Sequence, residues 1–215
     1  RNRANQAVLP LRGKILNVAS ASAEKLRANQ ELNDLMQAIG CGTGENYSEN
    51  SLRYEKIIIM TDADVDGAHI ASLLMTFFYR QTPKLIENGH LFLAMPPLFR
   101  ITQGGQTYYA KDEAHKDEII NEQLSSKTKI EISRFKGLGE MPASQLKETT
   151  MCPEKRNLLK ITVPNLDCLE TNSMKSKPMT RLEVDKTVDT LMGKKPELRF
   201  AYLQENAKFV TSIDV

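Results

Sequence analysis

The sequence has 215 residues, with 29 lysines and arginines against 27 aspartates and glutamates, which leaves a formal net charge of +2. A net charge this small does not by itself indicate a nucleic-acid-binding protein. A hydrophobic share of 40% with a mean hydropathy of −0.40 excludes disordered, fibrous and membrane proteins. The length allows one large domain or two small ones, each able to bury a core.

The cysteines Cys41, Cys152 and Cys168 are widely spaced, so the sequence offers neither a zinc-binding pair nor an even disulfide framework. We therefore expect reduced thiols and a cytosolic protein. We expect no membrane partner, because the first residues are no signal peptide and no stretch reaches the roughly 18 apolar residues of a membrane-spanning helix. The first residue is Arg1 and not Met, so we expect a piece of a longer protein.

The first part of the chain predicts alternating helices and strands. Residues 8–18 suit an irregular strand and a turn, because a proline and a glycine interrupt the apolar run. A helix is expected from about residue 22 until Gly40 ends it, and the polar residues 41–53 are typical of a loop. Residues 54–60 are a β-branched run of the kind that forms strands buried on both faces.

A helix and a second strand are expected after this run. The helix is indicated by apolar residues at the spacing of one helical face, which are Ile70, Leu73, Leu74, Phe77 and Phe78. It should kink or end around Pro83 to Gly89, and residues 90–95 should form the next strand. The order strand, helix, strand predicts a crossover in a parallel sheet, and therefore an α/β fold.

The second part of the chain predicts a hairpin followed by a mixture of elements. Residues 98–101 and 107–110 flank a Gly-Gly turn, and we place a domain boundary near Lys111. Beyond it we expect a helix at 112–124, a strand at 128–135, a short helix at 142–150, a strand at 158–163, a loop at 172–178, and two helices at 182–192 and 196–207.

The most informative residues are three aspartates at alternate positions, Asp62, Asp64 and Asp66, just after the strand at 54–60. Ligands of open α/β sheets sit at this edge. Three carboxylates so close together repel one another unless a cation neutralises them, and oxygen ligands suit Mg²⁺, with Mn²⁺ or Ca²⁺ as substitutes. The pattern therefore favours a divalent-metal site over a solvated acidic loop.

Two kinds of metal site share part of this acidic pattern. An EF-hand starts in the same way, but counting from Asp62 puts Leu73 where the calcium loop needs a bidentate glutamate. A phosphohydrolase of the haloacid-dehalogenase type has a similar loop, yet Ala68 replaces its hydroxyl residue and no later Gly-Asp or Asp-Asp pair completes its metal site. The EF-hand is excluded, and the phosphohydrolase stays a distant alternative.

Six stretches spread over nearly the whole chain carry a resemblance to a known family, namely PLRGKILNV, AIGCGTG, IIIMTDADVDGAHI, GHLFLAMPPLFRI, RFKGLGEMPASQLKETTM and LMGKKPELRFAYLQENA. In this order they resemble the carboxy-terminal part of the B subunits of bacterial type IIA DNA topoisomerases. Only about 25 residues separate Tyr109 from Arg134, whereas many gyrase B subunits carry a long insertion there. The short spacing and the LMGKKPELRF ending favour the topoisomerase IV branch, with gyrase B as the close alternative.

This resemblance implies a fold and an activity. Residues 1–110 would be a TOPRIM domain, a Rossmann-like parallel sheet flanked by helices, and residues 111–215 a smaller α+β tail with the KGLGEM motif. The activity implied is ATP-dependent double-strand DNA breakage, passage and rejoining in an A₂B₂ assembly, in the cytoplasm at the nucleoid. The A subunit would supply the catalytic tyrosine, and ATP would bind only in an N-terminal region outside this sequence.

The resemblance also assigns roles to acidic residues. Asp62 and Asp64 match acids that hold Mg²⁺, and Asp66 is expected as a secondary ligand because it lies nearby in the sequence. The first catalytic acid of the family lies in an E-G-D-S-A motif upstream of PLRGKILNV, and this motif is not in the sequence. We therefore expect this chain to bind metal weakly and to cleave no DNA by itself.

Basic and polar residues are expected to contact DNA. The positions that match family contacts are Lys14, Asn17, His69 and Arg199. Charge and motif neighbourhood add Arg12, Arg134 and Lys136. In the KGLGEM motif the glycines should permit tight backbone geometry or close approach to another chain, and the spacing is not that of a dinucleotide-binding loop.

Overall fold

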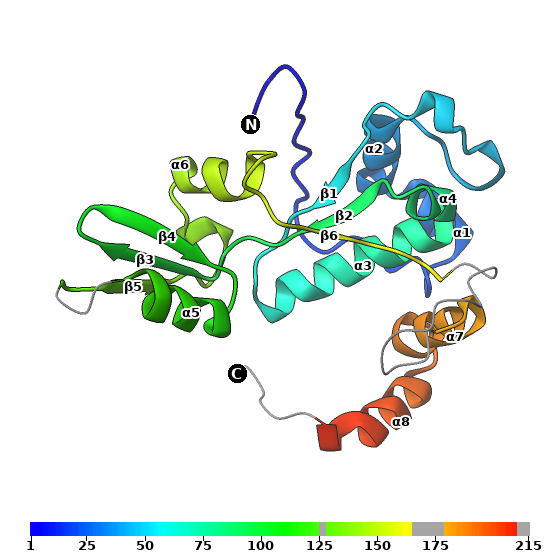
Figure 1. Ribbon diagram of the computed structural model, residues 1–215. Coiled ribbons are helices and arrows are strands. Elements are labelled where there is room, and N and C mark those ends of the chain that lie inside the picture. The colour runs from blue at the N-terminus through cyan, green and yellow to red at the C-terminus, as the bar shows by residue number, and fades with distance from the viewer. Residues whose placement is uncertain (125–127, 165–178, 210–215) are drawn as a thin grey trace. The chain divides into compact units, whose positions relative to one another are not determined.

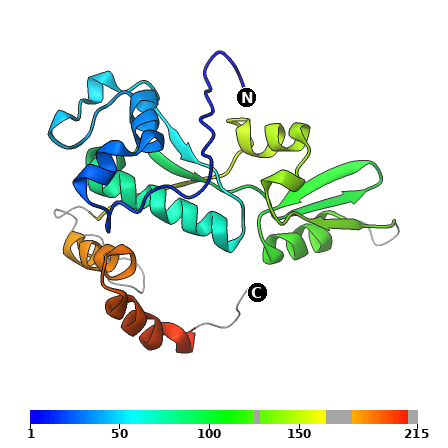
Figure 2. The same cartoon turned by 180° about the vertical axis from the view of Figure 1, so that it is seen from behind.

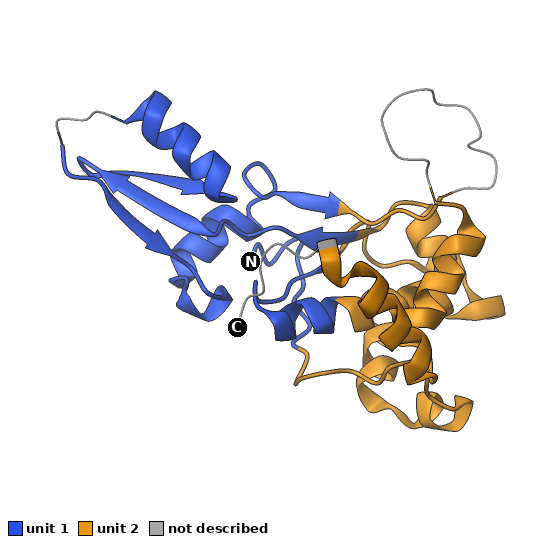
Figure 3. Cartoon of the chain, turned by 90° about the horizontal axis from the view of Figure 1, so that it is seen from below, with its two compact units in different colours: residues 1–10, 58–71, 92–159 blue, residues 11–57, 72–91, 160–215 orange. Residues whose placement is uncertain are grey.

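A computed structural model describes residues 1–124, 128–164 and 179–209 of the chain. The fold is mixed α/β, as the sequence predicts. Two compact units are present, as Figure 3 shows: unit 1 comprises residues 1–10, 58–71 and 92–159, and unit 2 comprises residues 11–57, 72–91 and 160–215. The domain boundary near Lys111 stays a prediction.

The first sheet contains β1 (Ile57–Ile59), β2 (Leu91–Ala94) and β6 (Leu158–Lys160), in the order β1-β2-β6. The backbone N–H of Ile57 donates to the carbonyl of His90 over 2.8 Å, so the starts of β1 and β2 lie together and these strands run parallel. This confirms the predicted crossover. Strand β6 instead runs antiparallel to β2, because Met95 bonds to Asn157 while Ile161 bonds to Leu91.

The helix that connects β1 to β2 is α3 (Val65–Gln81), and the short α4 (Pro83–Glu87) follows it. The predicted apolar face is confirmed, because Leu73, Leu74, Phe77 and Phe78 are all buried and Ile70 is half-buried. Helix α3 ends at Gln81, two residues before Pro83, which has no N–H to continue the helical ladder. The break therefore lies at Thr82, directly before the region around Pro83 to Gly89 in which the sequence predicts it.

The residues before β1 differ from the prediction in two places. Residues 8–18 form no strand, since Pro10 donates no ladder bond and Gly13 has a φ of 125°. One helix was expected up to Gly40, but the structure has α1 (Ala23–Ala28) and α2 (Gln30–Ile39). Asn29 causes the break, because its side chain accepts from the N–H of Leu32 at 2.9 Å and caps the second helix.

The loop at residues 41–53 contains two single turns, η1 (Gly44–Asn46) and η2 (Glu49–Ser51). At its start Cys41 is a free, buried thiol, and burial raises the pKa of this thiol. Cys152 is free as well. Cys168 lies outside the described residues, and the reduced state of the cysteines stays a prediction.

The second sheet lies in unit 1 and contains β3 (Phe99–Gln103), β4 (Gln106–Ala110) and β5 (Glu131–Arg134), in the antiparallel order β4-β3-β5. Gly104 and Gly105 form the predicted turn, each with a positive φ. Helix α5 (Glu113–Gln123) packs along this sheet in Figures 1 and 2. Their shared core consists of Phe99, Ile101, Ala110 and Ile119.

The remaining elements are short. In unit 1 a turn η3 (Leu138–Glu140) precedes α6 (Ala143–Leu146), which continues as one π-helical turn η4 (Lys147–Met151). In unit 2, α7 (Arg181–Met192) and α8 (Pro196–Asn206) form a helical pair that ends in the turn η5 (Ala207–Phe209). The expected loop at 172–178 lies outside the described residues. Among the helices that are described, none is both long and apolar enough to cross a membrane.

Candidate metal centre and DNA contacts

The acidic loop joins the end of β1 to the start of α3, and Asp64 begins the helix. Its carboxylate Oδ1 accepts the N–H of Gly67 at 2.7 Å, and its carbonyl accepts the N–H of Ala68 at 3.0 Å. A carboxylate at this position satisfies a backbone donor that the helix leaves unpaired and lies at the positive end of the helix dipole. Asp64 is nevertheless exposed, so it can reach a ligand.

Gly67 follows the aspartates because the chain turns back on itself there. A Cβ atom at this position would lie 2.1 Å from the carbonyl oxygen of Asp62 and 2.9 Å from its nitrogen. No side chain fits in that space, so only glycine lets the first turn of α3 pack against the loop. The glycine that directly follows Asp66 is thus required by packing.

Asp62 is held by a segment far away in the sequence. Its Oδ1 accepts the backbone N–H of Leu138 at 2.7 Å. A Cβ atom on Gly137 would lie 3.0 Å from the same oxygen. The close approach predicted for the KGLGEM glycines therefore occurs at Gly137, and it is an approach to Asp62 in the same chain.

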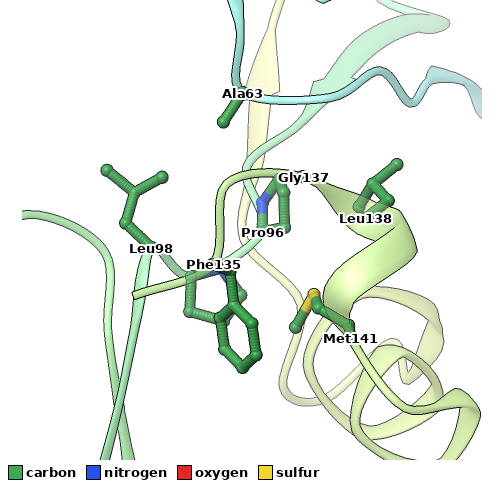
Figure 4. A pocket seen from close by; sticks show the side chains of 8 residues that line it. Ala63, Pro96, Leu98, Phe135, Gly137, Leu138 and Met141 are labelled. Carbon is green, nitrogen blue, oxygen red and sulfur yellow. The ribbon is translucent and has the colours of Figure 1, made fainter. Parts of the chain in front are cut away.

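A small apolar cavity is lined in part by Gly137 and Leu138, as Figure 4 shows. Its volume is about 10 Å³, which is at the lower limit for one water molecule. Ala63 of the acidic loop lines it on one side, Pro96 and Leu98 line it on another, and Phe135 and Met141 complete it. The acidic loop and the KGLGEM turn thus share one apolar support.

The carboxylates of Asp62 and Asp64 suit a magnesium ion that takes most of its ligands from water and phosphate. Both Asp62 and Asp64 are exposed, and each uses one oxygen for a backbone N–H; their second oxygens accept nothing from the residues that the structure describes. Within those same residues no group of three His, Cys, Asp or Glu side chains is close enough to hold a metal ion. Mg²⁺ often uses one or two carboxylates and takes its other ligands from water and phosphate. Asp66, in the first turn of α3, stays a prediction as a secondary ligand.

Three of the predicted DNA contacts lie in unit 1. His69 is exposed in α3 and has no hydrogen-bonding partner among the described residues. The guanidinium of Arg134 lies 5.9 Å from the ring centroid of Phe99 and is exposed. Lys136 is exposed at the start of the KGLGEM turn. All three side chains are thus accessible on their unit.

The other four predicted DNA contacts lie in unit 2, and two of them already have structural roles. Asn17 donates from Nδ2 to the carbonyl of Met192 at 2.8 Å. Arg199 donates from Nε to the carbonyl of Leu191 at 2.6 Å and from a terminal nitrogen to that of Gly193 at 3.1 Å. These carbonyls are at the end of α7, where helices leave acceptors unpaired. The remaining two, Arg12 and Lys14, are exposed.

Comparison with known proteins places the chain in a family. Residues 1–96 match the Toprim domain, and residues 127–204 match the carboxyl terminus of the DNA gyrase B subunit. The chain is 56% identical over 215 residues to the DNA topoisomerase 4 B subunit of Bartonella bacilliformis, covering 100% of the chain and 29% of that protein. It is 59% identical over 212 residues to the corresponding protein of Caulobacter vibrioides, covering 99% of the chain and 28% of that protein. The chain belongs to the B-subunit family of bacterial type IIA topoisomerases.

A gyrase relative is more distant. The DNA gyrase B subunit of Halalkalibacterium halodurans is 45% identical over 215 residues, covering 100% of the chain and 31% of that protein. The chain spans less than a third of the length of all three relatives. The Toprim match also decides how the acidic loop is interpreted, because its residues include Asp62, Asp64 and Asp66, and it favours the topoisomerase family over the phosphohydrolase.

Some residues that shape the site were not found from the sequence. Leu138 contributes only a backbone N–H, which no residue type reveals, and Gly137 acts through the absence of a side chain. The signal in the sequence was the pair of glycines in KGLG, which indicated tight backbone geometry or a close approach to another chain, whereas the approach is to Asp62 of the same chain. Chemically, the arrangement presents two fixed and exposed carboxylates beside a helix N-terminus, a site suited to a hard cation and a phosphate.

Proposed function

We propose that this chain is the Toprim and tail portion of a topoisomerase IV B subunit. The observation that carries the proposal is the identity of 56% and 59% to topoisomerase 4 B subunits, against 45% to a gyrase B subunit, over nearly the whole chain. The parent protein would break, pass and rejoin double-stranded DNA with ATP hydrolysis, and so unlink and relax chromosomes. The gyrase B subunit is the alternative, favoured by the match of residues 127–204.

The partners proposed are the topoisomerase IV A subunit and double-stranded DNA in an A₂B₂ assembly, in the cytoplasm at the nucleoid. The catalytic tyrosine comes from the A subunit. ATP binds in a part of the parent protein outside these residues. A glutamate of an E-G-D-S-A motif is not among them either, and for that reason we expect this chain to cleave no DNA by itself.

In this proposal Asp62 and Asp64 hold Mg²⁺, and Asp66 is a secondary ligand. A bound Mg²⁺ would stabilise developing negative charge and orient the leaving oxygen of the scissile phosphodiester. The protein's own contribution is to keep both carboxylates in place: Asp64 by capping α3, and Asp62 by accepting the N–H of Leu138. Neither has to reorganise when DNA arrives.

The DNA backbone would be contacted by Lys14, His69, Arg12, Arg134 and Lys136. His69 lies near the N-terminus of α3, where the helix dipole favours a phosphate. For Asn17 and Arg199 we propose contact through atoms that the carbonyl bonds at the end of α7 leave unused. Such contacts position DNA without reading its sequence.

The test is reconstitution of the full-length B subunit with its A partner on linked DNA circles. Wild type should unlink them with ATP and Mg²⁺, and Asp62→Ala should abolish unlinking. The matched control is Asp117→Ala, an exposed aspartate of α5 that should leave the activity unchanged. Unlinking unaffected by Asp62→Ala would overturn the metal assignment, and supercoiling of relaxed DNA would move the protein to gyrase.

A further inference from the structure

The KGLGEM turn is closed by its own glutamate. Glu140 Oε2 accepts the backbone N–H of Lys136 at 2.7 Å. The N–H of Glu140 donates to the carbonyl of Gly137 at 3.2 Å, and the N–H of Met141 donates to that of Leu138 at 3.2 Å. The Glu140 side chain thus bonds to the backbone of the first residue of the turn and closes it.

Both ends of this turn are anchored in apolar packing. Phe135 and Met141 flank it, and each is only 7% exposed. They line the small cavity of Figure 4 together with Leu98, whose carbonyl accepts the N–H of Phe135 at 2.8 Å. Because interiors are closely packed, the turn cannot shift without disturbing these contacts.

The turn presents two features to Asp62. The first is the N–H of Leu138, a donor to Oδ1 at 2.7 Å. The second is the bare Cα of Gly137, where an added Cβ would lie 3.0 Å from Oδ1 and 3.1 Å from Cγ. Asp62 lies in an irregular loop and is exposed, so no helix or strand of its own fixes its side chain.

We propose that the turn at residues 136–141 is the positioning element for Asp62, and that Glu140 and Gly137 are its positioning residues. Glu140 keeps the N–H of Leu138 aimed at Oδ1, and Gly137 leaves the space in which the carboxylate lies. The second oxygen of Asp62 is thereby kept for the cation. This inference rests on the proposed function only in that Asp62 is a metal ligand.

The two glycines of the motif provide a matched pair of variants. Gly137 has an extended backbone with a φ of −167°, so Gly137→Ala strains no dihedral and its Cβ presses on Asp62. At Gly139 an added Cβ meets nothing within 4 Å. Gly139→Ala therefore makes the same chemical change in the same turn without touching the carboxylate.

The experiment uses the full-length B subunit and has two readouts. The first is binding of Mn²⁺, a spectroscopic probe for Mg²⁺, to the B subunit, followed by electron paramagnetic resonance without DNA. The second is the Mg²⁺ concentration that gives half-maximal DNA cleavage with the A subunit. Groups that orient a metal ligand typically change affinity by about 10–100-fold. Gly137→Ala should raise both the Mn²⁺ dissociation constant and this Mg²⁺ concentration by about 10-fold, with cleavage recovering at saturating Mg²⁺, and Gly139→Ala should change neither.

Glu140 gives an independent pair. Glu140→Ala removes the acceptor for the N–H of Lys136 and should weaken Mn²⁺ binding in the same direction. Glu140→Gln keeps a side-chain oxygen that can accept this N–H. It should keep the Mn²⁺ dissociation constant within about twofold of wild type, well below the roughly 10–100-fold change expected on losing an orienting group. The two Glu140 variants therefore test the positioning of Asp62 even if Gly137→Ala does not fold.

Equal effects of the two glycine variants, or wild-type Mn²⁺ binding in both Gly137→Ala and Glu140→Ala, would overturn the proposal. The Asp62→Ala variant separates this failure from that of the proposed function. If Asp62→Ala abolishes Mn²⁺ binding and cleavage while the turn variants match wild type, only the positioning role is wrong. If Asp62→Ala itself binds Mn²⁺ as wild type does, the metal role of Asp62 is wrong.

Discussion

Side chains bind backbone N–H groups at the acidic loop, whereas side chains bind backbone carbonyls at the end of α7. At the loop, N–H groups of Leu138 and Gly67 donate to Asp62 and Asp64, and each carboxylate keeps an oxygen for a ligand. At the end of α7, carbonyls accept from Asn17 and Arg199. In the first region the structural hydrogen bonds hold a ligand oxygen in place, whereas in the second they use two of the five N–H donors of Arg199 and one N–H of Asn17.

The difference follows from the polarity of the helix. A helix start exposes unpaired N–H groups and favours an anion, while a helix end exposes carbonyls and favours a cation. A carboxylate that caps a helix start still has lone pairs to offer. An arginine at a helix end donates N–H groups to the free carbonyls, and Arg199 donates two in this way. A match to a DNA-binding position is therefore weaker support for function at Arg199 than at His69.

The largest effect is expected at Asp64, where capping and metal binding can be separated. Asparagine caps a helix as well as aspartate does, so Asp64→Asn should keep Tm near the wild-type value while DNA cleavage by the reconstituted enzyme falls on the order of 100-fold. Asp64→Ala should lose the cap too, and the free energy of unfolding should fall by about 1 kcal/mol. Cleavage assays and calorimetry measure the two effects. Full cleavage by Asp64→Asn would leave Asp64 as a cap alone.

A smaller effect is expected at Arg199, where stability and DNA binding can be separated. Arg199→Lys keeps the charge but loses the fork that reaches two carbonyls, so the free energy of unfolding should fall by about 2 kcal/mol. The slope of log K for DNA against log salt should stay at the wild-type value in Arg199→Lys and fall by about 1 in Arg199→Ala if the charge reaches a phosphate. Denaturation curves and salt titrations measure these quantities. An unchanged slope in Arg199→Ala would reduce Arg199 to its structural role.

Local features of both regions could be predicted from the sequence, and long-range contacts could not. The aspartates after a β-branched run and the helical spacing from Ile70 to Phe78 are short-range signals, and the structure confirms the helix that they predict. The helix before Gly40 was predicted too long, because its apolar spacing runs on across Asn29 although asparagine is a good cap.

The contacts that define the candidate site join residues distant in the sequence. Asp62 and Leu138 are 76 residues apart, and Asn17 and Met192 are 175 apart. Strand β6 joins the first sheet antiparallel to β2, an arrangement that no local pattern encodes. Strand order and backbone donors depend on how the whole chain packs, so residue types alone do not reveal them.

The smallest effect on stability is expected at Glu49, a carboxylate whose two oxygens both accept hydrogen bonds or contact a histidine. Oε2 of Glu49 accepts a hydrogen bond from the Tyr47 hydroxyl and a second one, at 2.7 Å, from Nδ2 of Asn88. Oε1 lies 2.5 Å from Nε2 of His90. These contacts, the Tyr47 bond foremost, hold the pKa of Glu49 below its ordinary value of 4.5. Unlike Asp62, this carboxylate keeps no oxygen for a ligand.

The sign of the pH dependence follows from this lowered pKa. The ionised carboxylate stabilises the folded chain above pH 4.5, and this contribution is lost as the pH falls through the lowered pKa. Glu49→Gln should therefore lower Tm at pH 7, and the difference from wild type should vanish at acidic pH. Because 43% of the side chain is exposed, the effect should stay below about 1 kcal/mol. Glu45→Gln, an exposed neighbour in the same loop, is the control, and a difference that persists at low pH would mean that Glu49 acts through packing and not through its charge.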